Sequence, residues 1–132
     1  MLLLIYRYLS NLFFIPILFF FFLRFLVSKE TISSVLEKFS ISRKKRPEGD
    51  LIWINGVSVG ESKTGIAVAR EIKKIKPESS ILFSTSTLSA YNLLSKSKNN
   101  FVVIFFPIDI NFLIKRFLKY WNPSSVIFIE SE

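Results

Sequence analysis

Residues 51–61 read LIWINGVSVGE, a short apolar run that ends in the turn-prone pair Asn55-Gly56. An uninterrupted apolar run of this length predicts a buried strand. Isoleucine and alanine then recur every third residue between Glu61 and Lys76, whereas the basic side chains fall largely at other positions. That spacing predicts an amphipathic helix, so the chain should turn from a strand directly into a helix.

The order of strands and helices along the rest of the chain predicts an α/β fold. Strands that alternate with helices at this spacing form a parallel sheet with helices on both faces. We therefore expect the front half of a Rossmann-like domain. After the first strand and helix, the expected elements are strands at 81–83, 101–106 and 126–129 and helices at 88–94 and 110–121, the last with Asp109 as its N-cap.

Residues 1–28 form an apolar leader that contains no acidic side chain and only two basic ones, Arg7 and Arg24. The uncharged run 12–23 would rise about 18 Å as a helix, against a hydrocarbon core of about 30 Å, but the wider segment is long enough to span. We expect a membrane-anchor helix, either as a short tilted span or lying partly in one leaflet. The alternatives are a cleaved signal peptide and a buried core helix. The absence of a convincing cleavage site argues against the signal peptide. The run of phenylalanines argues against the core helix, because it leaves no polar face for solvent.

The charged segment 29–50 separates this leader from the globular segment 51–132. It contains the run Arg43-Lys44-Lys45-Arg46, which reads either as a solvated linker or as a segment attracted to anionic lipid, at about 1 kcal/mol per basic residue. The positive-inside rule then places the following segment in the cytoplasm. The formal net charge of +8 also favours an anionic partner.

The absence of cysteine and histidine excludes several kinds of chemistry. Without cysteine the chain has no disulfide, no thiol nucleophile and no cysteine-based zinc site. Without histidine it has no Ser-His-Asp triad and no imidazole base. Proton transfer would fall to a carboxylate, a lysine or a tyrosine.

The first candidate site is the turn after the first strand, because ligands of open α/β sheets bind at the carboxyl ends of the strands. The spacing of Gly56, Gly60 and Lys63 does not fit a phosphate-binding P-loop, and no dinucleotide fingerprint is present. The turn delivers Glu61 to the first turn of a helix. Glu61 is either a residue that stabilises the helix N-terminus or a general base, with Gly60 allowing a substrate to approach the backbone.

Two further groups of polar residues follow later strands. The hydroxyl cluster Ser84-Thr85-Ser86-Thr87 either caps the next helix or binds a sugar or phosphate. Glu130-Ser131-Glu132 follows the last strand and would face the same crevice as Glu61, unless it is a solvated end.

These residues carry a resemblance to the 3-deoxy-D-manno-octulosonic acid (Kdo) transferases of lipopolysaccharide synthesis. Residues 51–61 resemble the family's WIHAVSVGE stretch, although Asn55-Gly56 replaces His-Ala. Residues 84–90 are similar to its TTMTPTG loop but lack the proline and glycine. Residues 106–109 and 122–132 are similar to LPYDLP and DPKLVLIMETE, in the same order.

The resemblance implies the N-terminal, acceptor-binding half of a two-domain (GT-B type) glycosyltransferase, preceded by the membrane anchor. Such enzymes are inverting, need no metal or other cofactor, and move Kdo from CMP-Kdo to the lipid A precursor, lipid IVA, at the cytoplasmic face of the inner membrane. The donor CMP-Kdo would bind in a C-terminal domain that residues 1–132 do not contain. We therefore expect these residues to be the front part of a longer protein and to be inactive alone.

The resemblance also assigns roles to residues. Glu61 would be the general base, and Glu132 or Glu130 a second functional carboxylate, with Glu132 favoured. Ser58, Gly60 and Thr85 would bind the acceptor. No nucleic-acid partner is expected. The alternative function is an inactive membrane-tethered fragment or a module that binds acidic lipid without chemistry.

Overall fold

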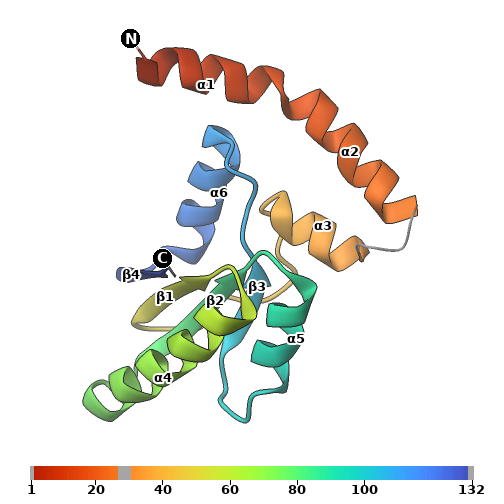
Figure 1. Ribbon diagram of the computed structural model, residues 1–132. Helices are drawn as coiled ribbons and strands as arrows, with labels where there is room; N and C mark the ends of the chain where they lie inside the picture. The colour runs from red at the N-terminus through yellow and green to blue at the C-terminus, as the bar shows by residue number, and fades with distance from the viewer. Residues whose placement is uncertain (1, 27–30, 131–132) are drawn as a thin grey trace. The chain divides into compact units, whose positions relative to one another are not determined.

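The computed structural model describes residues 2–26 and 31–130, and Figure 1 shows the chain from its N-terminal helices to its last strand. We refer to its two compact units as the leader unit, Met1–Ser42 with Pro107–Lys119, and the sheet unit, Arg43–Phe106 with Tyr120–Glu132. In chain order the elements are α1 (Leu2–Leu12), α2 (Phe14–Leu26), α3 (Ile32–Lys38), β1 (Leu51–Gly56), α4 (Val59–Ile75), β2 (Ser80–Thr85), α5 (Leu88–Lys96), β3 (Val102–Phe105), α6 (Asn111–Trp121) and β4 (Ser125–Ile129).

The four strands of the sheet unit form one parallel sheet in the order β3-β2-β1-β4. The predicted α/β fold with a parallel sheet is therefore confirmed, and the order is consistent with a Rossmann-like domain. β1 lies between two neighbours, and all of its residues are buried. The turn that follows β1 is consequently flanked by the ends of β2 and β4.

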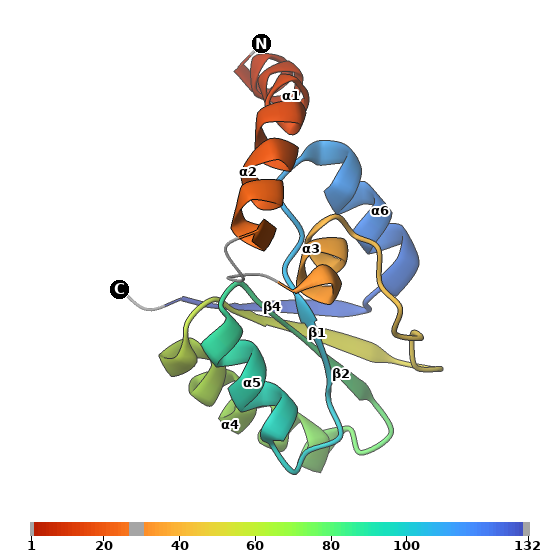
Figure 2. The ribbon, with the colours of Figure 1, turned by 90° about the vertical axis from the view of Figure 1, so that its right-hand side faces the viewer.

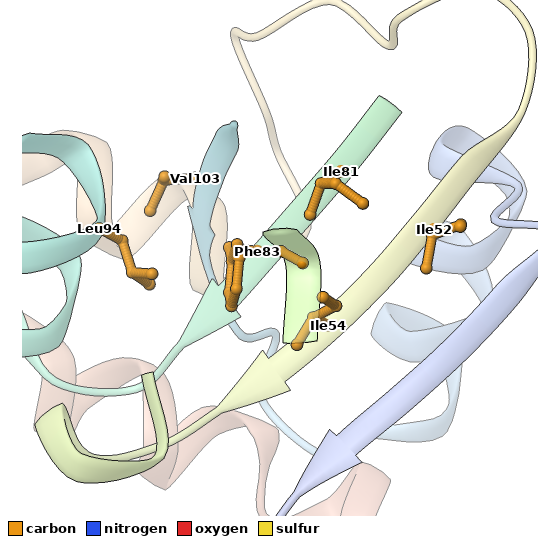
Figure 3. Close-up of a cluster of buried hydrophobic side chains, with 7 residues drawn as sticks. Ile52, Ile54, Ile81, Phe83, Leu94 and Val103 are labelled. Carbon is orange, nitrogen blue, oxygen red and sulfur yellow. The ribbon is translucent and has the colours of Figure 1, made fainter. Parts of the chain in front are cut away.

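The core of the sheet unit lies between the sheet and two helices, α4 and α5, which cover the same face (Figure 2). Apolar side chains at alternate strand positions point to this face, because successive side chains of a strand point to opposite sides. Figure 3 shows six of the buried side chains that form it, Ile52, Ile54, Ile81, Phe83, Leu94 and Val103.

Gly65 of α4 determines how closely that helix approaches the sheet. A Cβ atom at this position would lie 2.7 Å from Cε1 of Phe83 and 3.3 Å from Cγ2 of Ile54. Both neighbours have no exposed surface, so neither can move away without disturbing the core. The helix packs against β1 and β2 at this distance only because residue 65 has no side chain.

The leader contains two helices where one was predicted. α1 ends at Leu12 and α2 begins at Phe14. Pro16 explains the break, because it has no N–H to donate to the carbonyl group of Leu12, four residues earlier, and its ring clashes with that carbonyl. Within residues 2–26 and 31–130, no helix combines the length and the apolar character that crossing a membrane requires. The predicted anchor is therefore not seen as a spanning helix.

A small apolar cluster holds the leader unit together. Phe39, Ile110 and Leu113 are buried in it, and Phe14 and Phe21 of α2 pack against them. The two α2 rings lie edge-on to Phe39, each at 5.9 Å between ring centroids. α2 is thus partly a packed helix, as one alternative held, but many of its side chains remain exposed.

The prediction that Asp109 caps the last helix is wrong. α6 begins at Asn111, and the carboxylate of Asp109 instead accepts a hydrogen bond of 2.7 Å from the hydroxyl group of Tyr6. This hydrogen bond raises the pKa of Tyr6, because a phenolate could not donate it and would lie beside a negative charge.

Two residues of the basic run 43–46 are bound within the sheet unit. The Lys44 ammonium donates to the hydroxyl group of Tyr91 at 2.8 Å and to the carbonyl group of Val103. Arg46 donates to the carbonyl groups of Trp121, at 2.7 Å, and Asn122, at 3.3 Å, which end α6. A cation suits this position because the last carbonyls of a helix carry partial negative charge.

The run 43–46 was predicted to be either a solvated linker or a segment attracted to anionic lipid. Neither interpretation describes all four of its residues. Arg43 and Lys45 are exposed, whereas Lys44 and Arg46 are partly buried and serve the fold. The boundaries predicted at residues 28 and 50 stay predictions. The two compact units of the structure are divided after Ser42, Phe106 and Lys119.

The contact of Gly65 gives a test of the packing between α4 and the sheet. Gly65→Ala should lower the free energy of unfolding by about 1–3 kcal/mol, because overpacking a dense core forces neighbours out of position. Gly60→Ala is the matched control, since a Cβ atom there would meet only Oγ of Ser58, at 3.9 Å. It should change stability by less than about 1 kcal/mol, in the stabilising direction. Urea unfolding followed by tryptophan fluorescence measures both, and equal effects would contradict the proposed packing.

Candidate functional site

The turn between β1 and α4 is fixed by a reciprocal pair of hydrogen bonds at the start of the helix. Ser58 is the N-cap residue, and its Oγ accepts from the backbone N–H of Glu61 at 3.2 Å. In return, Oε2 of Glu61 accepts from the backbone N–H groups of Val57, at 2.7 Å, and Ser58, at 3.2 Å. This is a capping box, which satisfies N–H groups that have no partner inside the helix.

The capping box gives Glu61 a structural role and a fixed direction at the same time. Hydrogen bonds from backbone N–H groups to a carboxylate are charge-assisted and hold it firmly. A carboxylate has about four lone-pair positions, so capping and proton transfer can use different ones. Glu61 is partly exposed, at the carboxyl edge of the sheet. The structural role that the sequence suggested is therefore seen, and it is compatible with the role of a base.

The two glycines of the turn have different surroundings. A Cβ atom on Gly56 would lie 3.2 Å from the backbone carbon of Glu61 and from the backbone nitrogen of Ser62. A side chain at residue 56 would therefore fit only tightly against the start of α4. Gly60 is exposed, and a Cβ atom there would meet nothing closer than 3.9 Å. Gly60 is thus the glycine with open space in front of its backbone.

The end of β2 is tied to the same turn. The hydroxyl groups of Thr85 and Thr87 both donate to the carbonyl group of Val57, at 3.1 and 3.3 Å. Thr87 is also the N-cap of α5, as one reading of the hydroxyl cluster predicted. Thr85 has no exposed surface, so it positions the turn from within, and its role in binding an acceptor stays a prediction. Ser86 and Thr87, the two residues of the cluster that follow Thr85, are exposed, although only Thr85 was predicted to bind the acceptor.

A buried chain of hydrogen bonds lies just beneath this edge of the sheet. The indole N–H of Trp53 donates to Oγ of Ser84 at 2.7 Å, and that hydroxyl group donates to Oδ1 of Asn55 at 2.7 Å. Trp53 and Asn55 are two residues apart on β1, so they share a face, and Ser84 is the register partner of Asn55. The asparagine that distinguishes this turn from the WIHAVSVGE pattern is therefore held by the neighbouring strand.

The third strand end brings another carboxylate to the same edge. Ile129, the last residue of β4, is paired with Gly56, the last residue of β1. Glu130 follows directly and is exposed. It therefore leaves the sheet beside the turn that carries Glu61. Glu132, the favoured second carboxylate, lies outside the described residues.

The structure thus brings Ser58, Gly60, Glu61 and Glu130 to one edge of the sheet unit, with Thr85 buried behind them. Within residues 2–26 and 31–130, no three acidic side chains gather in a way that could hold a metal ion. What the edge offers is carboxylates, hydroxyl groups and exposed backbone. Such groups can orient a polyhydroxylated ligand and accept a proton from one of its hydroxyl groups.

Comparison with known proteins connects this edge to an enzyme family. The sequence model of the family described as 3-deoxy-D-manno-octulosonic-acid transferase (kdotransferase) matches residues 33–132. The chain belongs to the Kdo transferase family. The matched range includes β1, α4 and all the predicted site residues, whereas α1 and α2 precede it.

Two relatives show the extent of the similarity. The chain is 38% identical over 112 residues to a 3-deoxy-D-manno-octulosonic acid transferase of Rickettsia bellii, which covers 84% of the chain and 27% of the relative. It is 37% identical over 100 residues to a probable mitochondrial 3-deoxy-D-manno-octulosonic acid transferase of Arabidopsis thaliana, covering 73% of the chain and 22% of the relative. The chain therefore spans only about a quarter of the length of these relatives. No solved structure matches it.

The position of Thr85 leads to a test of how the turn is held. Thr85→Val keeps the shape of the side chain but removes one of the two donors to the carbonyl group of Val57. We expect the free energy of unfolding to fall by about 1 kcal/mol, the usual contribution of one hydrogen bond, and amide hydrogen exchange to accelerate at 57–60.

The matched control is Thr64→Val, on the exposed side of α4, where the hydroxyl group bonds, within the described part of the chain, only to the preceding turn of its own helix. That variant should leave exchange at 57–60 unchanged. Equal exchange rates in the two variants would show that the contact from Thr85 does not hold the turn.

Proposed function

We propose that this chain is the acceptor-binding half of an inverting, metal-independent glycosyltransferase that moves Kdo from CMP-Kdo to the lipid A precursor, lipid IVA. Membership of the Kdo transferase family supports the transferred sugar and the class of reaction. The observation that carries the mechanism is Glu61, held by backbone N–H groups at the carboxyl edge of a parallel sheet. The donor CMP-Kdo would bind in a second Rossmann-like domain of a GT-B enzyme.

In the proposed reaction, a hydroxyl group of the acceptor lies beside Glu61, near the open backbone of Gly60. As the acceptor oxygen bonds to the anomeric carbon of Kdo, its proton passes to the carboxylate of Glu61. The bond from the anomeric carbon to the phosphate oxygen breaks at the same time, and CMP leaves with the bonding electrons. Attack from the face opposite CMP inverts the configuration. A positioned general base contributes about 10²–10⁴-fold to such a step.

A second carboxylate on the same edge would orient the acceptor. Glu130 is the described residue at that place, because it leaves the sheet next to Gly56. Glu132 stays the other candidate. An exposed carboxylate can accept hydrogen bonds from sugar hydroxyl groups, because each hydroxyl group has an O–H that can donate. Ser58 is less available, because its hydroxyl group already accepts from the helix.

We propose that the protein lies at the cytoplasmic face of the inner membrane. The exposed apolar side chains of the leader unit support contact with a membrane. Phe19, Phe20 and Phe22 of α2 are each more than half exposed, at 62%, 53% and 57%. Because the leader is broken into two short helices, we favour contact with one leaflet, the second of the predicted arrangements. A groove of about 450 Å³ between α2 and α3 would accept acyl chains; it is lined by Leu18, Phe21, Phe22, Ile32, Val35 and Leu36.

The proposed base can be tested in a chimera in which this chain replaces the corresponding segment of the Rickettsia bellii transferase. Glu61→Gln preserves an oxygen that can accept the capping hydrogen bonds but cannot take up a proton. We expect Kdo transfer from CMP-Kdo to lipid IVA to fall by about 10²–10⁴-fold, mainly in kcat.

Glu71→Gln is the matched control, because Glu71 lies on the same helix, is exposed, and among the described residues pairs only with Lys74, at 2.6 Å. It should leave transfer unchanged. A Glu61→Gln chimera with normal kcat would exclude the proposed base. An inactive parent chimera that still binds lipid would favour the alternative function, a module for acidic lipid without chemistry.

Membrane contact through α2 can be tested separately on this chain with vesicles that contain anionic phospholipid. Replacing both Phe19 and Phe22 by serine should weaken vesicle binding by tenfold or more, because burying one such side chain contributes about 1.5–3 kcal/mol. The control replaces Ile75 and Leu88, exposed side chains of the sheet unit, by serine. Flotation of both variants measures the difference, and equal binding would contradict the assignment to α2.

A further inference from the structure

A polar cavity lies at the edge of the sheet unit opposite to the proposed site. Its volume is about 290 Å³. The walls come from the second half of α4, the first residue of β2 and the loop before β3, all at the amino-terminal ends of the strands. Along α4 the rise from Glu61 to Arg70 is about 14 Å, so the cavity is separate from the catalytic edge. The lining residues are Arg70, Lys73, Ser80, Asn99, Asn100 and Phe101.

One of these residues has a buried hydrogen-bond donor without a partner. The side-chain nitrogen Nδ2 of Asn99 is shielded from solvent and bonds to nothing within the described part of the chain. The backbone of the residue is held in place, because its main-chain carbonyl group accepts from the backbone N–H of Phe101 at 2.8 Å. Leaving a buried donor unpaired is costly, and a bound ion, ligand or water is the common explanation in native proteins. Asn99 also lines the cavity, so an acceptor bound there is one way to satisfy this amide.

The charges of the cavity indicate that this acceptor is an anion. The guanidinium group of Arg70 has no hydrogen-bond or ion-pair partner among residues 2–26 and 31–130. The ammonium group of Lys73 is fixed nearby, because it donates to the carbonyl groups of Pro77, at 3.0 Å, and Ser79. These bonds use two of its three N–H donors and leave its charge uncompensated. The neighbouring acid Glu71 is already paired with Lys74.

We propose that this cavity binds a phosphate-class oxyanion, either as free phosphate or as a phosphate ester. Guanidinium, ammonium and amide N–H groups are all donors, and a tetrahedral oxyanion accepts from several at once. The volume of the cavity, about 290 Å³, lies just below the usual range for small-molecule sites, about 300–1,000 Å³, which suits a small anion. Phe101 also lines the cavity, and an aromatic residue there suits the organic part of an ester. This site stands independently of the proposed transferase function.

The test titrates inorganic phosphate into the chain, at constant ionic strength and with chloride as the reference anion. We expect calorimetry to show saturable binding. In NMR spectra, we expect changes in the chemical shifts of backbone amides only in the second half of α4 and at residues 97–101. Arg70→Gln should weaken the binding by tenfold or more, since it removes the cation of the cavity that makes neither a hydrogen bond nor an ion pair among the described residues. Asn99→Ala should weaken it several-fold.

Arg43→Gln is the matched control, because Arg43 is an exposed arginine of the same unit outside the cavity. It should bind phosphate as the unchanged chain does. Comparison with glycerol 1-phosphate and with vesicles of phosphatidylcholine containing phosphatidic acid distinguishes a free anion, a soluble ester and a lipid headgroup.

Thermal unfolding of each variant shows whether it is folded. Unsaturable binding, or the same loss in Arg43→Gln as in Arg70→Gln, would overturn the proposed site. Unchanged binding in both Arg70→Gln and Asn99→Ala would do so as well.

Discussion

The backbone of Val57 is the point on which the proposed site depends. Its N–H donates to the carboxylate of Glu61, and its carbonyl group accepts from Thr85 and Thr87. One peptide segment thus joins the start of α4 to the end of β2. Both the direction of Glu61 and the open space before Gly60 follow from this arrangement, because a turn free to move would hold neither. The strand order β3-β2-β1-β4 makes it possible by placing β2 directly beside β1.

Local sequence patterns predicted the strand, the turn and the helix at residues 51–76, because each element there follows from its own periodicity and turn residues. The same patterns could not predict that Thr85 would be buried or that Asn55 would bond to Ser84, since both depend on which strands become neighbours. The break in the leader at Phe13 was accessible from the sequence. Proline inside a helix breaks or bends it, and Pro16 removes the hydrogen bond to the carbonyl group of Leu12. This property of proline alone predicts two helices in the leader.

The net charge of +8 overstates the charge available to an external anion, because some of the basic side chains bind groups of the protein itself. Arg46 binds the carbonyl groups that end α6, and Lys44 binds Tyr91 and a strand carbonyl. These charges are used within the fold, and only part of the basic run can face an external anion. The sequence gives the number of basic residues. It does not distinguish a basic residue that binds the carbonyl groups at a helix end from one that is exposed to solvent.

The close contact between Gly65 and Phe83 has a consequence for how this protein can vary over evolutionary time. The two positions are coupled in size, because a side chain at 65 needs a smaller residue at 83, and Ile54 limits the remaining room. Neither single change is neutral, since one overfills the core and the other leaves a void. A lineage could exchange the pair only by passing through a less stable form. The pair should therefore change together or not at all.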